Sequence, residues 1–393
     1  MAMVLAGTSL AFAAGAQTND GDTTTAVDVH GFVSQGFIKT SANDYLAHSK
    51  RGSFEFSEAG INFTKSVTDD LRVGFQLFAQ DLGPTGDYRP KFDWYFLDWR
   101  FRDWLGIRAG RTKIPFGLYN ETSDIDAARV PILLPQSVYP IDHRDYLLAQ
   151  TGAEVYGNVR LGAAGSVEYR AYGGTIFTDP PKPPASGISV DDLQMPYVYG
   201  GRVLWSPIDG LSLGGSYQAL RFDWTYQLSP ELLGPLQTVG VVPAGVGPSL
   251  ATKFRVKLWV GSLEYQAGPV LFSAEYARWI GEFESLAPKL LPPHVVNERY
   301  YGMVSLRVTP WFTPGIYYSV YVPNVEHREG RESHQYDAAV SFRYDLNPHW
   351  ILKLEGHYLE GTAALDKDLN GGVEAKDLTK TWGMLLLKTT AYF

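Results

Sequence analysis

Leu385-Leu386-Leu387-Lys388-Thr389-Thr390-Ala391-Tyr392-Phe393 closes the chain, and this strand-like segment stops on an aromatic residue. Segments of this kind recur in pairs along the whole sequence, and short polar turns join the members of each pair. Apolar and polar residues alternate in them, as in a β-barrel that stands in lipid and encloses a wet interior. We therefore expect an all-β fold, a closed antiparallel transmembrane β-barrel, and a transport function rather than chemistry.

Seven short connections rich in Gly, Pro, Asp and Asn separate the alternating segments, and these residues are the ones that turns require. They lie at 66–70, 102–104, 161–165, 206–210, 266–268, 309–311 and 345–348. Seven such turns predict about sixteen strands, with both termini at the turn end of the barrel. The eight remaining connections are longer: 40–52, 81–91, 115–150, 178–196, 223–252, 281–298, 323–334 and 361–378. Short periplasmic turns and long extracellular loops are typical of outer-membrane barrels.

The alternation also assigns the two faces of each strand. From Leu71 to Gln80, the residues of one parity are apolar and are expected to face lipid, whereas Arg72 and Gln76 are expected to face the lumen. A soluble sandwich would alternate too, but it would not need aromatic residues beside so many turns. Those residues predict a girdle at the inner interface: Trp99, Trp104, Trp205, Tyr265, Trp311, Trp350 and Phe393. The parity changes after Phe56, which predicts a bulge near Ser57 or Glu58, and it is ambiguous from Val256 to Tyr265.

Composition excludes several other classes of protein. The mean hydropathy is −0.14, and no apolar run of about 18 residues is present that could span a membrane as a helix. The chain has no cysteine, which excludes disulfides and thiolate sites, and its net charge of −8 argues against nucleic-acid binding. We find no hydrolase, zinc-protease, phosphate-loop or dinucleotide motif. The sequence therefore predicts neither an enzyme nor a required cofactor.

The amino terminus has the pattern of a secretion signal. Residues 1–16 contain an apolar core and a small-residue cleavage site, so we expect a signal peptide remnant, although the usual basic start is missing. Residues 17–25 read as a polar periplasmic lead-in. We expect one barrel domain over 26–393.

Three stretches carry a family resemblance. They are Gly106-Ile107-Arg108-Ala109-Gly110-Arg111-Thr112-Lys113-Ile114-Pro115-Phe116-Gly117-Leu118-Tyr119-Asn120-Glu121, Ser57-Glu58-Ala59-Gly60-Ile61-Asn62-Phe63, and the closing Lys388–Phe393. They resemble bacterial outer-membrane porins, most of all the phosphate-selective porin family. The resemblance implies a sixteen-stranded barrel in the outer membrane of a Gram-negative bacterium, in contact with membrane lipid and lipopolysaccharide. It also implies a homotrimer and a third loop, at about 115–150, that folds inward and forms the constriction. The phosphate-specific members carry lysines there, whereas residues 117–150 contain none.

The third loop holds the candidate constriction residues, Glu121, Asp124, Asp126, Arg129 and Arg144. Opposed acidic and basic groups in a narrow wet passage create a field that orders water and filters ions. We favour this interpretation because long loops without regular structure are usually functional. The alternative is an acidic, solvated external loop.

Strand parity also assigns charged residues to the lumen. The candidate pore-lining residues are Arg72, Arg108, Arg170, Arg202, Arg307, Arg343, Lys353, Lys388, Glu154, Glu168, Glu275 and Glu355. Their basic excess predicts a mild preference for anions. The alternative is that these groups only pair across strands and solvate the lumen.

The last loop contains oxygen donors at the spacing of a calcium-binding loop. Asp366, Asp368, Asn370, Glu374 and Asp377 fall at positions one, three, five, nine and twelve, with glycine at six. The spacing predicts calcium there, although no helix is expected on either side. An acidic surface loop would match the same pattern by chance.

Together these patterns favour an outer-membrane porin for passive diffusion of small hydrophilic solutes. The alternative from another class is a sheath that encloses a partner protein, such as an electron-carrying cytochrome. Open-channel conductance of the purified protein would favour the porin, and co-purification with a haem protein would favour the sheath.

Overall fold

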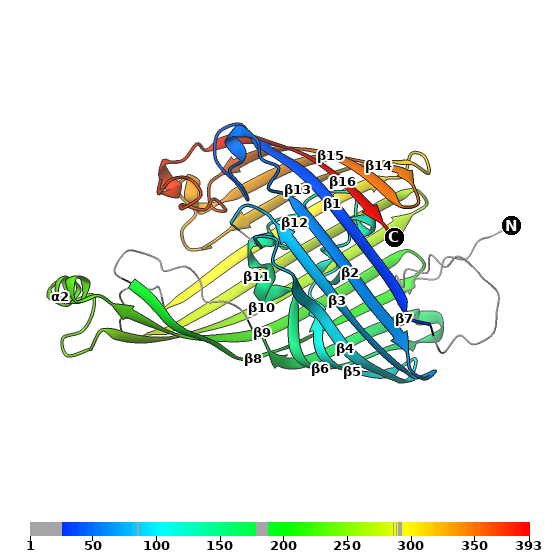
Figure 1. The fold of residues 1–393 in the computed structure, drawn as a ribbon, viewed down its shortest axis with the longest axis horizontal. Helices are drawn as coiled ribbons and strands as arrows, with labels where there is room; N and C mark the ends of the chain where they lie inside the picture. Colours follow the sequence, from blue (N-terminus) through cyan, green and yellow to red (C-terminus); the bar gives the residue numbers. More distant parts are fainter. Residues whose placement is uncertain (1–25, 85, 178–187, 286, 288, 290–292) are drawn as a thin grey trace.

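The computed structural model describes residues 26–84, 86–177, 188–285, 287, 289 and 293–393. The predicted signal remnant and lead-in, 1–25, lie outside the described residues. Sixteen antiparallel strands form a closed barrel, as predicted, and each strand pairs with its neighbours in sequence (Figure 1). The first half comprises β1 (Asp28–Thr40), β2 (Ser57–Ser66), β3 (Leu71–Asp81), β4 (Lys91–Arg102), β5 (Leu105–Lys113), β6 (Ala149–Arg160), β7 (Ser166–Thr175) and β8 (Ile188–Ile208). The second half comprises β9 (Leu211–Leu228), β10 (Ser249–Ala267), β11 (Val270–Ser285), β12 (His294–Leu306), β13 (Phe312–Val322), β14 (Gln335–Asn347), β15 (Trp350–Gly361) and β16 (Thr381–Tyr392).

The closing contact joins the two ends of the chain. β1 pairs antiparallel with β16 from Phe32↔Tyr392 to Thr40↔Met384, so the barrel has no free sheet edge there. The start of β1 and the end of β16 lie on the side of the short turns, opposite the long loops (Figure 1). All seven predicted turns join consecutive strands, from β2–β3 to β14–β15.

Helices are few and short. They are α1 (Arg144–Leu147), α2 (Pro230–Thr238), η1 (Ser49–Arg51), η2 (Asn120–Thr122), η3 (Asp126–Ala128), η4 (Ile141–His143), η5 (Gly162–Ala164), η6 (Arg331–Ser333) and η7 (Ala375–Asp377). No helix within the described ranges has the length and apolar character needed to cross a membrane. α2 sits at the tip of the long strands β8, β9 and β10, which extend beyond the rest of the barrel (Figure 1).

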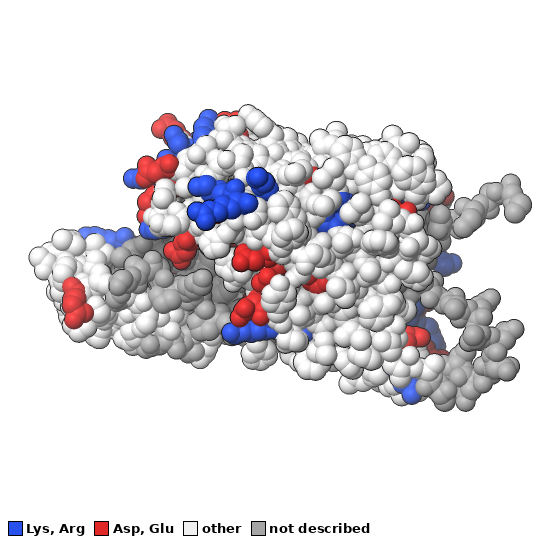
Figure 2. Space-filling view, turned by 45° about the horizontal axis from the view of Figure 1, so that its top comes forward, with Lys and Arg blue, Asp and Glu red and all other residues white. Residues whose placement is uncertain are grey.

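The outer face has the layout expected of a lipid-facing wall. All seven predicted girdle residues beside the turns are exposed, by between 41% for Trp205 and 62% for Phe393. A second row of exposed tyrosines lies closer to the loop end: Tyr276, Tyr300, Tyr318 and Tyr358. In Figure 2, a basic and an acidic cluster lie near the middle of the view, and the wall to their right, toward the turn end of the barrel, shows few charged side chains.

At two places the sequence left the strand parity irregular. The structure corrects the prediction at the first and assigns the inner face at the second. The parity change near β2 does not come from a bulge at Ser57 or Glu58, because β2 pairs without interruption from Ser57 onward. Instead Gly36 bonds to Phe56 and Ile38 bridges Ser53, so the extra residue falls just before the strand. In β10, the ambiguity is resolved with Val256, Leu258 and Val260 buried on the inner face and Trp259 exposed on the outer face.

Candidate functional site: the loop inside the barrel

The longest connection between strands whose residues are all described, 114–148 between β5 and β6, folds into the barrel interior (Figure 1). It contains the short helices η2, η3, η4 and α1. Its bonds to the wall range from Gln76 on β3 to Lys388 and Thr390 on β16. A buried backbone must be hydrogen-bonded, and many of the loop's N–H and carbonyl groups find their partners in polar side chains of the lumen wall. The wall therefore determines where the loop lies.

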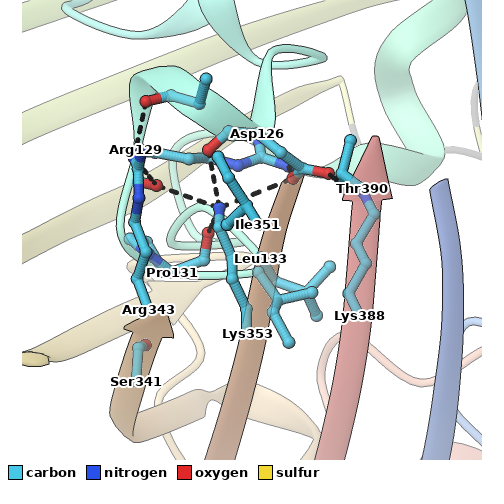
Figure 3. Close-up of polar contacts among 12 residues, drawn as sticks. Asp126, Arg129, Pro131, Leu133, Ser341, Arg343, Ile351, Lys353, Lys388 and Thr390 are labelled. Atoms are coloured by element: carbon cyan, nitrogen blue, oxygen red, sulfur yellow. Dashed lines mark hydrogen bonds and ion pairs between the residues drawn. The ribbon is translucent and has the colours of Figure 1, made fainter. Parts of the chain in front are cut away.

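Asp126 in η3 is the main ionic anchor of the loop (Figure 3). Its carboxylate lies 2.9 Å from Lys388 Nζ, 3.7 Å from Lys353 Nζ and 3.3 Å from Arg129 Nη2, and the Thr390 hydroxyl donates to it at 2.7 Å. Burial alone would raise the pKa of Asp126, but Lys388, Lys353 and Arg129 outweigh it and hold that pKa well below its usual range. Asp126 is thus a carboxylate whose charge is neutralised by cations from two neighbouring strands and from its own loop.

The same part of the wall also binds the loop backbone. Lys353 Nζ donates to the carbonyls of Asp126, Arg129 and Pro131 at 2.8, 3.0 and 3.2 Å (Figure 3). Arg343 Nη1 donates to the Ala127 carbonyl at 2.6 Å. Both side chains were predicted to line the pore. In the structure Lys353 binds the loop, and Arg343 divides its donors between the loop and Asp345 on its own strand.

Two wall carboxylates complement these cations by accepting backbone N–H groups. Glu355 of β15 accepts from Ile132 at 2.7 Å and from Leu133 at 3.0 Å. Glu275 of β11 accepts from Leu118 at 2.9 Å and also binds the hydroxyls of Tyr139 and Tyr301. Two acids predicted to face the lumen therefore clamp the loop at separate points.

The first half of the loop is held by a second charged group near β5–β8. Glu121 pairs with Arg170 and, at 3.0 Å, with Arg202. Burial alone would raise the pKa of Glu121, but the two guanidinium groups lower it below its ordinary value.

Asp124 and Arg144 tie the loop to the wall at β4 and β5. Asp124 pairs with Lys113 at 2.5 Å, and Arg144 pairs with Asp93 at 2.7 Å. Burial opposes ionisation of Asp124, but Lys113 and Arg144 prevail and lower its pKa to about 2. All five candidate constriction residues thus lie inside the barrel in ion pairs, and their role in ion filtering remains a prediction.

A cavity of about 50 Å³ separates the loop from the wall at β2 and β3. Asp124, Arg129 and Arg144 line it from the loop, and Glu58 and Gln80 line it from the wall. A water molecule occupies about 30 Å³ in the liquid, so this gap has room for one or two. Acidic and basic groups meet across it, which is the arrangement that produces a transverse field.

The other side of the loop is apolar, and this contradicts the expectation of a uniformly polar interior. Phe116, Leu134 and Val138 are buried in one cluster with inward residues of the wall. The wall residues in that cluster include Val198, Leu220, Val256, Leu258, Val260, Ala277 and Met303. Where the loop lies against it, the inner face of β8–β12 is apolar, because there it contacts the loop and not water.

The basic residues assigned to the lumen are largely neutralised. Arg72, Arg108, Arg170, Arg202, Arg343, Lys353 and Lys388 each form an ion pair with a carboxylate. Arg307 lies just past the end of β12 and is exposed. Glu154 is buried beside Arg108 and Arg170, and Glu168 pairs with Arg202. This pairing is the arrangement described by the alternative interpretation, in which the groups pair across strands, and the mild preference for anions remains a prediction.

Several residues of this site were missed by the sequence analysis. Asp93 interrupts the regular pairing of β3 with β4, so alternation did not assign it a face. The parity change before β2 left the orientation of Glu58 unassigned, but its carboxylate binds Lys388 Nζ at 2.5 Å. Arg299 donates to the Ser137 carbonyl at 2.8 Å, and only its inward parity on β12 could have indicated it.

The last loop does not gather its candidate calcium ligands around one point. The Asn370 amide donates to the carbonyls of Asp44 and Asp366, and Glu374 pairs with Lys367. Asp366 accepts from the Asp368 N–H at 2.7 Å, and Asp377 lies in η7. No group of three or more acidic or histidine side chains suited to a metal occurs in the part of the chain that the structure describes. The calcium site remains an untested prediction.

Comparison with known proteins identifies the fold. No family model and no curated protein sequence matches the chain. Among solved structures, it is similar to the outer-membrane expressed OmpT of Vibrio cholerae, with 10% identity and a TM-score of 0.60 over 93% of this chain and 97% of that one. An anion-selective porin from Comamonas acidovorans has 13% identity and a TM-score of 0.56 over 94% and 99%. The outer membrane channel DcaP of Acinetobacter baumannii has 14% identity and a TM-score of 0.54 over 93% and 97%. The chain therefore has the barrel fold of bacterial outer-membrane proteins.

Proposed function

We propose that this protein is a passive outer-membrane channel for small hydrophilic solutes, narrowed by the loop 114–148. The observation that supports this most is the attachment of the loop across the lumen, by Glu275 on β11, Glu355 on β15 and Asp93 on β4. A loop held at several points inside a closed barrel sets the size of the passage. Because the loop packs against the inner wall through an apolar cluster on one side and ion pairs on the other, it narrows the lumen. We therefore expect small conductance and passage of water and small ions before larger solutes.

Selectivity is the finer part of this proposal. The ion pairs of the lumen leave little uncompensated charge, so we propose a weak preference. Anions are favoured through Arg72, which shares the Asp98 carboxylate with Arg108 and whose side chain is 46% exposed. The phosphate-selective subtype receives no support from the loop, which contains no lysine from 117 to 148. The same resemblance suggests a homotrimer in contact with lipopolysaccharide, which native mass spectrometry of the purified protein would test.

A sheath around an electron carrier is the less favoured function. The loop occupies space that an inserted protein would need, and removing it would break the ionic contacts of Asp126 and Asp124. We therefore propose a channel and not an insulating sleeve.

The decisive experiment is planar-bilayer recording of the purified protein. We expect stable, ohmic, low-conductance steps and a modest reversal potential in a salt gradient. Absence of steps from correctly folded, heat-modifiable protein would refute the channel. Clear cation preference would refute the proposed selectivity while leaving the channel in place.

A further inference from the structure

The outer face of the barrel carries a groove of about 810 Å³ that runs across β13, β14, β15, β16 and the end of β1. Its floor consists of small residues on outward positions of three neighbouring strands: Ala338, Gly356 and Gly383. Large apolar side chains border it: Ile316, Val340, Tyr358 and Leu385. The groove is shallow and open along its outer side, so it would contact one side of a bound molecule.

The groove is polar at one end only. Lys39 and Ser41 line it where β1 reaches the loop end of the barrel. Lys39 is exposed and forms no ion pair with any residue in the described ranges, whereas the nearby Lys380 pairs with Glu360 at 2.8 Å. An apolar trough that ends in an unpaired ammonium group matches a molecule with a hydrocarbon chain and an anionic head.

We propose that this groove binds one lipid A moiety of lipopolysaccharide, with an acyl chain over Gly356 and a phosphate against Lys39. The inference rests on the membrane location in the proposed function, but not on conduction. The end with Lys39 faces the loop side, which is the leaflet that carries lipopolysaccharide in an outer membrane. An acyl chain that lies along the floor of the groove gains close packing contacts that a flat wall would not provide.

A second copy of this chain is the competing occupant. The groove is concave and has its single uncompensated charge at one end, so a protein partner would need a protruding apolar ridge beside an acidic group. A lipid meets both requirements in one molecule. We therefore favour lipid and treat self-association as an outcome of the test.

The charge is tested by native mass spectrometry of the full chain in detergent, with purified lipid A or lipid A stripped of its phosphates added. One lysine near a membrane surface contributes about 1 kcal/mol toward anionic lipid, so we expect an approximately fivefold preference for the phosphorylated form. Lys39→Gln is expected to reduce that ratio to about one. Arg278→Gln removes an exposed outward-facing charge on β11, outside the groove, and is expected to keep the ratio.

A bulky side chain placed in the floor of the groove tests whether the lipid binds there. A side chain at Gly356 meets no atom within 4 Å of its Cβ, and the same holds at Gly302 on β12, which lies outside the groove. Gly356→Phe is expected to lose binding of both the phosphorylated and the phosphate-free lipid A, whereas Gly302→Phe is expected to bind both as the wild type does. If Gly356→Phe bound lipid A as well as the wild type, the proposal would be overturned. So would a change of oligomeric state in Gly356→Phe without loss of lipid, because the groove would then join two copies. Conductance is read in the same preparations: its absence from the wild type would count against the channel and leave the lipid result standing.

Discussion

Replacing Asp126 with asparagine should release the loop from the lumen wall. The substitution keeps the size of the side chain but removes the negative charge that faces Lys388 at 2.9 Å and Lys353 at 3.7 Å. The two lysine side chains are only 1% and 2% exposed, so neither ammonium can recover its hydration without movement of the loop.

The magnitude follows from the partners that remain. Removing one partner of a buried ion pair costs about 3–5 kcal/mol. Lys388 keeps Glu58, and Lys353 keeps three backbone carbonyls, so we take the lower end, about 3 kcal/mol. At about 1.4 kcal/mol per factor of ten, the equilibrium between attached and detached loop should shift by roughly a hundredfold.

The assay combines current and labelling. Asp126→Asn is expected to give larger and noisier single-channel steps than the wild type. Because the chain has no cysteine, one introduced at Ala128 reports loop exposure by its rate of thiol modification, and that rate should rise strongly in Asp126→Asn.

Asp142→Asn is the matched control. It removes the same charge from the same loop at a carboxylate that is 61% exposed, and it should leave both readouts near wild type. If Asp126→Asn and Asp142→Asn behaved alike in both assays, the reasoning about the ionic anchor would be refuted.

Three further predictions concern pH, selectivity and metal. Asp124 has a pKa of about 2 in the folded protein, below the value of about 3.9 in an unfolded chain. The stabilisation from its ion pair should therefore be complete above about pH 4 and lost as pH falls through 2, and thiol labelling at residue 128 that rises between pH 7 and 5 would contradict this. Arg72→Gln should shift the reversal potential in a potassium chloride gradient toward cations because Arg72 is half-exposed, with Arg278→Gln on the outer wall as the control. Calcium bound by Asp366, Asp368 and their neighbours should raise the melting temperature, and Asp368→Asn should abolish the rise; an unchanged wild-type melting temperature on calcium addition would eliminate that site.

Much of the barrel could be predicted from the sequence because period-two alternation and turn residues are local signals. Strand number, closure and the girdle residues depend only on those signals, and Trp99 or Trp350 could be placed from its distance to a turn. The contacts of the loop depend on residues far apart in sequence, such as Asp126 with Lys388. Parity could place Lys353 inside the barrel, but could not indicate that it binds backbone carbonyls and not a passing solute.

The apolar inner wall is the clearest failure of local reasoning. Val256, Leu258 and Val260 are as hydrophobic as lipid-facing residues, so no rule based on water inside and lipid outside could assign them. Their inward orientation could be assigned only by knowing that Phe116 and Val138 of the loop would occupy the lumen opposite them. The same limitation applied to Phe56, whose ring is buried against Lys388 just ahead of β2.

The loop connects nearly opposite sides of the ring of strands, through Arg144 to Asp93 on β4 and through Leu118 to Glu275 on β11. Because the loop is attached at both places, its position depends on the shape of the barrel. If the surrounding bilayer compresses the barrel into an ellipse, the distance between the two attachment points changes and the loop between them must shift. Permeation through this protein should therefore depend on membrane tension and lipid packing.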